Sequence, residues 1–120
     1  MINSKKLNEL LNREICESDG VKAIILVNKE GGIFSLGVKK ENAETNSQIN
    51  HISSVLVSSF NEYNSNNHTI KDLYLESSNG KFIIGHTHFK NLFLIVWFEY
   101  NATIGKVHIK FNNINNALSG

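Results

Sequence analysis

Apolar residues recur along this chain with two kinds of spacing, and each kind predicts one type of element. Steps of three and four residues predict three amphipathic helices, at residues 4 to about 19, about 42–63 and 104–118. Continuous or alternating apolar runs bounded by turn residues predict five strands. These strands are expected at residues 21–28, 33–38, 70–76, 81–87 and 92–98. The order is therefore helix, two strands, helix, three strands, helix.

Two short patterns indicate how these strands are arranged. Asn79-Gly80 predicts a tight hairpin between the third and fourth strands, because a type I′ turn needs positive φ at both positions. Residues 92–98 are apolar on both faces, which indicates a strand covered on both sides by helices, in the middle of the sheet beside residues 21–28. We therefore predict one α/β (α+β) domain over residues 1–120, a three-layer α/β/α sandwich around a five-stranded, mainly antiparallel sheet.

The central helix and the strand that follows it carry a pattern that concerns association. One flank of the helix is small (Ser53, Ser54, Val57 and Ser58), and small side chains let a second helix approach closely. A solvated serine-rich face is the alternative interpretation, and the sequence leaves both open. Residues 70–76 form a short alternating strand; at a sheet edge, its unpaired backbone groups would be a template for another strand. Together the two elements would form a flat docking surface suited to a symmetric or pseudo-symmetric dimer.

Composition excludes several classes of protein. The chain has 120 residues, 41% of them hydrophobic, which fits one core, and its formal net charge is +1. With this near-neutral charge and Arg13 as the single arginine, we expect no nucleic-acid partner. The single cysteine, Cys16, excludes an internal disulfide framework and a thiolate zinc cluster, and it suits a reducing compartment. The longest apolar run, residues 92–98, is far short of the roughly 20 residues that span a bilayer, so no direct membrane insertion is expected.

Motifs for catalysis and cofactor binding are missing from the sequence. It contains no glycine-rich nucleotide loop, nucleophile elbow or H-E-x-x-H helix, so we expect no cofactor. Cys16 is more simply a small core residue near a helix end than a nucleophile. Asp72 and Glu76 share a strand face but lie roughly 13 Å apart, too far for paired-carboxylate catalysis. We therefore predict a protein without catalytic or cofactor-binding residues.

His86-Thr87-His88 is the arrangement with the most suggestive metal-ligand spacing. Residues two apart on a strand face the same side, so both imidazoles could reach one metal ion, with His68 or His51 as a third ligand. The alternative is a pair of solvent-exposed histidines on an edge strand or loop. Because no Asp or Glu adjoins them, we favour the second interpretation and predict no metal site.

Three segments, in this order, carry a resemblance to a known family. They are residues 7–11 (LNELL) in the first helix, residues 20–32 (GVKAIILVNKEGG) in the first strand and its turn, and residues 101–107 (NATIGKV) at the entry to the last helix. With this spacing the chain resembles the roadblock/LC7 family over nearly its whole length. The opening helix, the first turn and the hairpin at residues 76–81 are most similar to the smaller roadblock subunit of the late-endosomal Ragulator adaptor.

The resemblance implies a non-catalytic module that dimerises, with itself or with another roadblock chain, so that the long helix and next strand of both chains form one continuous sheet. Relatives scaffold or regulate small GTPases, of Rag type in Ragulator or Ras-like in bacteria and archaea, and others are dynein light chains. This implies a cytoplasmic protein that reaches an endosomal or lysosomal membrane only through partners. Mapped onto this sequence, the dimer surface comprises Ser53, Val57, Phe60, Ile70, Asp72, Tyr74 and Glu76.

Other functions stay open from the sequence. The resemblance is also compatible with a GTPase-activating or co-activating partner, although Arg13, expected on the opposite helical layer, argues against an arginine finger. A dynein light-chain-like cargo adaptor fits the same family. A profilin- or longin-like module would instead be a monomer with a hydrophobic groove, and a metal-dependent enzyme built on His86 and His88 is the last alternative.

Overall fold

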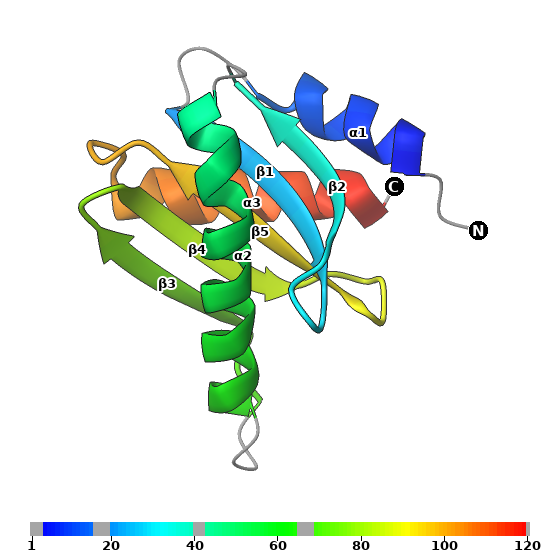
Figure 1. The fold of residues 1–120 in the computed structure, drawn as a ribbon. Coiled ribbons are helices and arrows are strands. Elements are labelled where there is room, and N and C mark those ends of the chain that lie inside the picture. Colours follow the sequence, from blue (N-terminus) through cyan, green and yellow to red (C-terminus); the bar gives the residue numbers. More distant parts are fainter. Residues whose placement is uncertain (1–3, 16–19, 40–42, 65–68, 120) are drawn as a thin grey trace.

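The computed structural model describes residues 4–15, 20–39, 43–64 and 69–119 (Figure 1). Helices and strands follow one another in the predicted order. The elements are α1 (Ser4–Arg13), β1 (Val21–Asn28), β2 (Ile33–Val38), α2 (Ala43–Asn64), β3 (Asp72–Ser77), β4 (Gly80–His86), β5 (Leu92–Phe98) and α3 (Ile104–Ser119).

The five strands form one sheet in the order β2-β1-β5-β4-β3, and every neighbouring pair is antiparallel. β5 lies in the middle beside β1, with Ile95 opposite Ile25, and all of its residues are buried. The position predicted from its two apolar faces is therefore confirmed. β2 and β3 are the two edges of the sheet, so the third strand is an edge strand.

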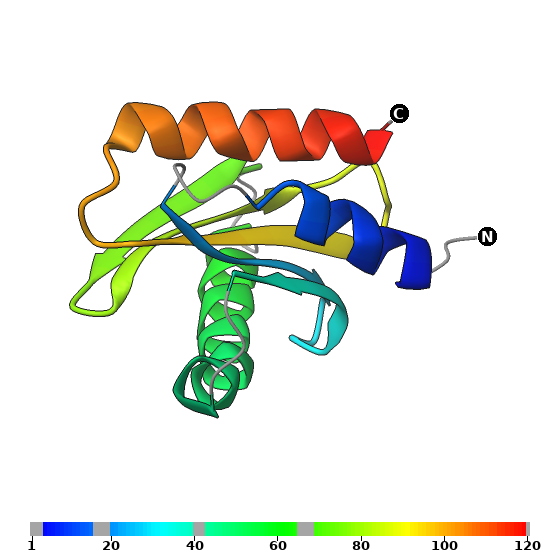
Figure 2. The ribbon, with the colours of Figure 1, turned by 90° about the horizontal axis from the view of Figure 1, so that it is seen from above.

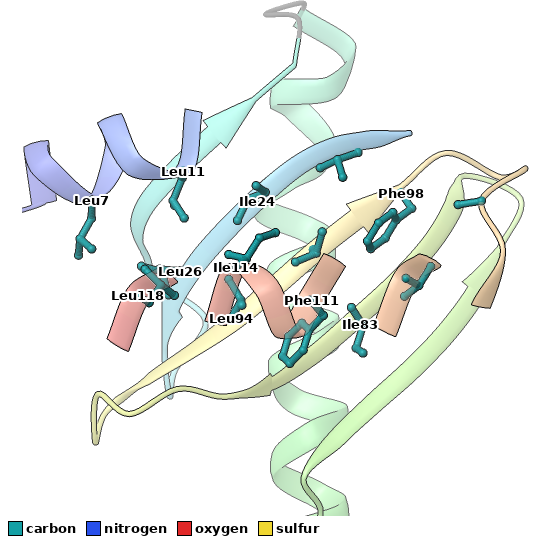
Figure 3. Packing of buried hydrophobic residues seen from close by; sticks show 14 residues of the cluster. Leu7, Leu11, Ile24, Leu26, Ile83, Leu94, Phe98, Phe111, Ile114 and Leu118 are labelled. Carbon is teal, nitrogen blue, oxygen red and sulfur yellow. The ribbon is translucent and has the colours of Figure 1, made fainter. Parts of the chain in front are cut away.

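Helices cover both faces of this sheet, two on one side and one on the other. α1 and α3 lie on one face, and α2 lies alone on the opposite face (Figure 2). Alternate strand residues divide the core accordingly. Ile24 and Leu26 pack with α1 and α3 (Figure 3), whereas Ile25 and Val27 face α2. The predicted three-layer sandwich is confirmed. One helix, α2, covers one face of the sheet, and two helices, α1 and α3, cover the other.

The hairpin between β3 and β4 differs by one residue from the predicted turn. Ser77 pairs with Gly80, so the turn consists of residues 78–79 rather than 79 and 80. Gly80 opens β4 with a φ of +136°, and a Cβ there would overlap the carbonyl oxygen of Phe98 and lie 2.8 Å from Trp97 Nε1. The glycine is therefore required by contact with β5, which rules for isolated turns do not include.

Two other elements are shorter than predicted. α1 ends at Arg13 rather than near residue 19, and Cys16 lies outside the described residues. β3 begins at Asp72 rather than at residue 70. Within the described ranges, none of the helices has the length and hydropathy needed to cross a membrane.

Candidate functional site

The two edges of the sheet differ in how their backbone groups are satisfied. At β2, the Asn8 side chain of α1 lies against the edge, where its Oδ1 accepts hydrogen bonds from the Leu36 N–H, at 2.9 Å, and from the Ser35 hydroxyl. None of the described residues caps the outer side of β3 in this way. Unpaired strand edges readily pair with an added strand, so β3 is the edge open to association.

An apolar groove of about 270 Å³ lies between α2 and the β3–β4 hairpin. Ile52, Val55 and Leu56 line it from the helix, and Leu75 and Phe82 line it from the sheet. The polar lining residues are His51, Glu76, Ser77 and Asn79. Val55 is 46% exposed and adds an accessible apolar side chain to the rim of the groove. Because the groove adjoins the β3 edge, helix and strand form one continuous surface, which we call the α2–β3 surface.

The three helix residues expected to contact a second chain lie on the inner side of α2. Ser53, Val57 and Phe60 are 0%, 2% and 0% exposed, because they face the sheet and pack within their own chain. They continue the helical spacing that begins at Ile49, which is also buried. In the single chain these side chains are buried, and the outward side of α2 carries Val55; contact of either set with a second chain stays a prediction.

The small flank of α2 does permit a close approach, but of the chain's own β1–β2 turn. A Cβ on Gly31 would lie 3.3 Å from Ser54 Cα, and Gly31 has a φ of +93°. About two helical turns further on, Asn61 Nδ2 donates a hydrogen bond of 2.9 Å to the Lys29 carbonyl. Small side chains are needed for either an internal or an external close approach, so the sequence pattern does not distinguish the two.

The strand residues expected at the surface lie on or beside the open edge. The Ile70 N–H donates a hydrogen bond of 2.9 Å to Asn64 Oδ1, and the Ile70 side chain packs against the core beneath α2. Asp72 and Tyr74 are half-buried in β3, and Glu76 is exposed. This location is compatible with the predicted interface, and their contact with a second chain stays a prediction.

Tyr74 and Glu76 interact across one side of β3. The Tyr74 hydroxyl donates a hydrogen bond of 2.7 Å to Glu76 Oε1, and Lys81 Nζ lies 3.9 Å from the same oxygen. Burial, this hydrogen bond and the negative charge of Glu76, in that order, raise the pKa of Tyr74 to about 12. The phenol therefore remains protonated near neutral pH and keeps its hydrogen bond to Glu76.

The end of β4 rules out the strand geometry assumed for His86 and His88. β4 ends at His86, one residue earlier than predicted. Thr87 Oγ1 accepts a hydrogen bond of 3.1 Å from the Phe89 N–H and donates one of 2.9 Å to the Leu92 carbonyl. These side-chain bonds form a turn in place of the strand ladder. His88 is therefore not two positions along a regular strand from His86.

The two imidazoles consequently lie on opposite sides of the sheet. The His86 ring packs against Phe60 of α2, with centroids 5.0 Å apart, whereas His88 Nδ1 lies 3.4 Å from Ser119 Oγ of α3. His51 lies on α2, and His68 is outside the described residues. In the part of the chain that the structure describes, no three His, Cys, Asp or Glu residues are grouped so that they could hold a metal ion.

Arg13 lies on the layer opposite the α2–β3 surface. It is the last residue of α1, its side chain is exposed, and α1 packs on the other face of the sheet from α2 (Figure 2). The predicted separation of the single arginine from the expected interface is therefore confirmed.

The arrangement of strands and helices is that of a roadblock-like α+β sandwich. No protein-family model matches the chain, and no curated protein sequence matches it. Solved structures do match. MglB of Myxococcus xanthus superposes with a TM-score of 0.72 over 98% of this chain and 94% of that one, at 16% sequence identity. A roadblock/LC7 domain from Streptomyces avermitilis gives a TM-score of 0.73 over 93% of both chains, at 9% identity.

A structure from another class of protein also superposes. Profilin II of Acanthamoeba castellanii matches with a TM-score of 0.61 over 92% of this chain and 94% of that one, at 11% identity. Identities this low establish the fold and nothing further. The predicted roadblock-like fold is confirmed, and the function has to be argued from the α2–β3 surface.

Proposed function

We propose that this chain is a non-catalytic scaffold subunit that dimerises through the α2–β3 surface and presents a binding surface to a small Ras-like or Rag-type GTPase. The observation that carries the dimerisation step is the difference between the sheet edges. Asn8 caps the Leu36 N–H on β2, whereas β3 has no such cap among the described residues. Pairing of β3 with another edge strand would satisfy these backbone groups and extend the sheet.

The uneven helix layers support the same conclusion. Five strands at their usual spacing extend over roughly 20 Å, and one helix covers only about 10 Å of that width. On the α2 face the half-buried Leu75 lies beside the exposed Val55, in the groove that the buried Phe82 also lines. A helix from a second chain, placed beside α2, would cover this surface while the two β3 strands pair. This arrangement is the one that the roadblock resemblance implies.

The finer parts of the proposal rest on the sequence resemblance. In a Ragulator-like complex the chain would pair with a second roadblock chain in the cytoplasm, and its partners would bring it to an endosomal or lysosomal membrane. The alternative is a GTPase-activating or co-activating partner of bacterial or archaeal type, which the likeness in fold to bacterial MglB favours. Because Arg13 lies on the opposite layer, activation would proceed by reordering the catalytic residues of the GTPase itself.

The dimerisation step is tested by co-expressing the chain with itself and with other roadblock-fold chains from the same genome. Solution mass from light scattering should show at least one dimer. Val55→Glu, which places a charge in the groove, should abolish it. Ile109→Glu is the matched control, because Ile109 is 63% exposed on α3, on the other face. A dimer that survives Val55→Glu but is lost in Ile109→Glu would place the interface on α3 and contradict the proposal.

GTP hydrolysis separates the two functional alternatives. Binding of the dimer is measured with candidate small GTPases from the same genome that are loaded with GDP or a GTP analogue. Single-turnover hydrolysis is measured separately with the same GTPases loaded with GTP. Binding with an unchanged rate is expected for a scaffold, and an accelerated rate would support the activating alternative. Binding of dynein or cargo chains without any GTPase would instead favour the light-chain-like adaptor.

A further inference from the structure

The two sides of β3 differ sharply in chemistry. Leu73 and Leu75 point toward the core beneath α2, whereas Tyr74 packs on the side of α3. Because strand residues alternate, Asp72 and Glu76 share the Tyr74 side. The open edge of the sheet is therefore apolar on its α2 side and acidic on its α3 side.

Few cations balance this acidic strip. Glu76 is 3.9 Å from Lys81, and Lys81 Nζ also donates a hydrogen bond to the Ala102 carbonyl. The Asp72 side chain forms no ion pair or hydrogen bond within the described part of the chain.

Two further titratable groups lie beside the strip. Lys71 immediately precedes β3 and its side chain is exposed. Because strand residues alternate, Lys71 belongs to the same side as Leu73, opposite the acidic strip. The His108 ring of α3 lies 6.2 Å from the Tyr74 ring, measured between centroids. Neither is in ion-pair contact with Asp72 or Glu76. On the α3 side of β3 the strip therefore has two carboxylates, Asp72 and Glu76, and one ammonium group, that of Lys81, while Lys71 belongs to the other side.

Pairing β3 with a second copy of itself would bring two such strips together. An antiparallel pair keeps the apolar sides aligned only when residues of like orientation face each other. In the register centred on Tyr74, Asp72 lies directly opposite Glu76 of the second copy, twice, at about 5 Å between Cβ atoms. In the register centred on Leu75, the two Glu76 residues become diagonal neighbours at roughly 7–8 Å. Both registers place four carboxylates along one seam.

We propose that β3 selects, as its partner, the edge strand of a different chain that carries lysine or arginine at the facing positions, in preference to a second copy of this chain. The proposal rests on the dimerising function proposed above and specifies that the dimer is a heterodimer rather than a homodimer. The apolar groove supplies contact area for either partner, and the acidic strip decides between them. Opposite charges across a strand pair stabilise it, and like charges directly opposite destabilise it.

Two charge variants test this proposal without knowledge of the natural partner. Asp72→Lys/Glu76→Lys supplies a basic edge on the same fold, and Asp72→Asn/Glu76→Gln removes the charge. Glu9→Lys/Glu30→Lys is the control, because it changes the net charge equally at exposed positions on α1 and the β1–β2 turn. Folding of every variant is checked by circular dichroism, and association is measured by sedimentation velocity and titration calorimetry.

We expect wild type to bind the Asp72→Lys/Glu76→Lys variant at least tenfold more tightly than it binds itself. That preference should weaken as NaCl rises from about 50 to 500 mM, because surface charges are screened. The neutral variant should associate with itself at least tenfold more tightly than wild type does. The Glu9→Lys/Glu30→Lys control should bind wild type no more tightly than wild type binds itself.

Several results would overturn the proposal. Wild type that self-associates as tightly as the neutral variant would show that the acidic strip does not oppose self-pairing, and the dimerising function would stand. Equal binding of wild type to the control and to the Asp72→Lys/Glu76→Lys variant would show attraction between net charges rather than recognition at β3. If no mixture associates, the neutral variant included, the dimerising function itself is wrong and the proposal fails with it.

Discussion

Replacing Gly80 with alanine tests the closest contact between β4 and β5. An L-residue held at a φ of +136° costs about 1–3 kcal/mol in backbone strain. The new Cβ would overlap the Phe98 carbonyl and lie 2.8 Å from Trp97 Nε1, so the indole must move. Its hydrogen bond of 3.0 Å to the Asn79 carbonyl would then be lost, at a further cost of about 1–2 kcal/mol. We expect a total loss of about 2–5 kcal/mol, a large part of the roughly 5–15 kcal/mol that stabilises a typical domain.

Trp97 provides the assay for this substitution. It is the only tryptophan and is 0% exposed, so its emission reports on its own surroundings. Gly80→Ala should shift that emission to longer wavelength and lower the Tm by roughly 8–20 °C, at about 4 °C per kcal/mol for a domain of this size. Gly105→Ala is the control, because no atom lies within 4 Å of a Cβ at that position in α3. Alanine there should be neutral or stabilise the chain by up to about 1 kcal/mol.

The refuting result is specific. A Gly80→Ala protein whose free energy of unfolding stays within about 1 kcal/mol of wild type, with unchanged Trp97 emission, would show that the strands do not approach this closely. If Gly80→Ala and Gly105→Ala lower the free energy of unfolding equally, the loss of stability comes from replacing any glycine and not from the contact of Gly80 with β5.

Three further predictions test other parts of the structure. Ser53→Ala should raise the free energy of unfolding, measured by urea denaturation, by about 1 kcal/mol. The buried Ser53 hydroxyl has no hydrogen-bond partner among the described residues, and alanine favours helices. A loss of stability would contradict this. Val57→Glu should destabilise the chain by about 4 kcal/mol or more, because Val57 is buried. Val55→Glu, at an exposed position, should fold like wild type by circular dichroism. Equal stability of the two variants would contradict the assigned faces of α2. The pKa of Tyr74 rises from 10.0 to about 12 on folding, so its stabilising contribution is complete below pH 10.0 and is lost as the pH rises through 12. Between pH 10.0 and 12, the free energy of unfolding from urea titrations should fall by about 2 kcal/mol more for wild type than for Tyr74→Phe. If that free energy falls in parallel with pH for both proteins, the pKa shift of Tyr74 is refuted.

Much of the fold could be predicted because its determinants are local. The bounds of Val21–Asn28, Ile33–Val38 and Leu92–Phe98 match the predicted strands residue for residue. Each is an apolar or β-branched run that ends at turn residues, and such a run needs no knowledge of its neighbours to be identified. The central place of β5 followed from its apolar faces, because a strand with no polar side has to be covered on both sides.

The candidate site could be predicted only in part. The sequence indicated α2 and β3, the same two elements that form the α2–β3 surface, but not which side of α2 faces outward. Ser53 and Val57 are small, and that pattern suits contact with a second chain or with the chain's own core equally well. The exposed Val55, rather than the small residues, marks the outer side of the helix, and nothing in the local sequence separates it from a core valine.

The sequence by itself therefore determined the type and order of the elements, the sheet's antiparallel character and its buried central strand, because spacing, turn residues and apolar runs act over a few residues. Only the tertiary structure decided which helix face is free, which sheet edge is capped, and where the β3–β4 turn falls. It also placed His86 and His88 on opposite sides of the sheet. These features depend on contacts between residues far apart in the chain, such as Asn8 with Leu36 and Gly80 with Phe98, whose energies no local pattern contains.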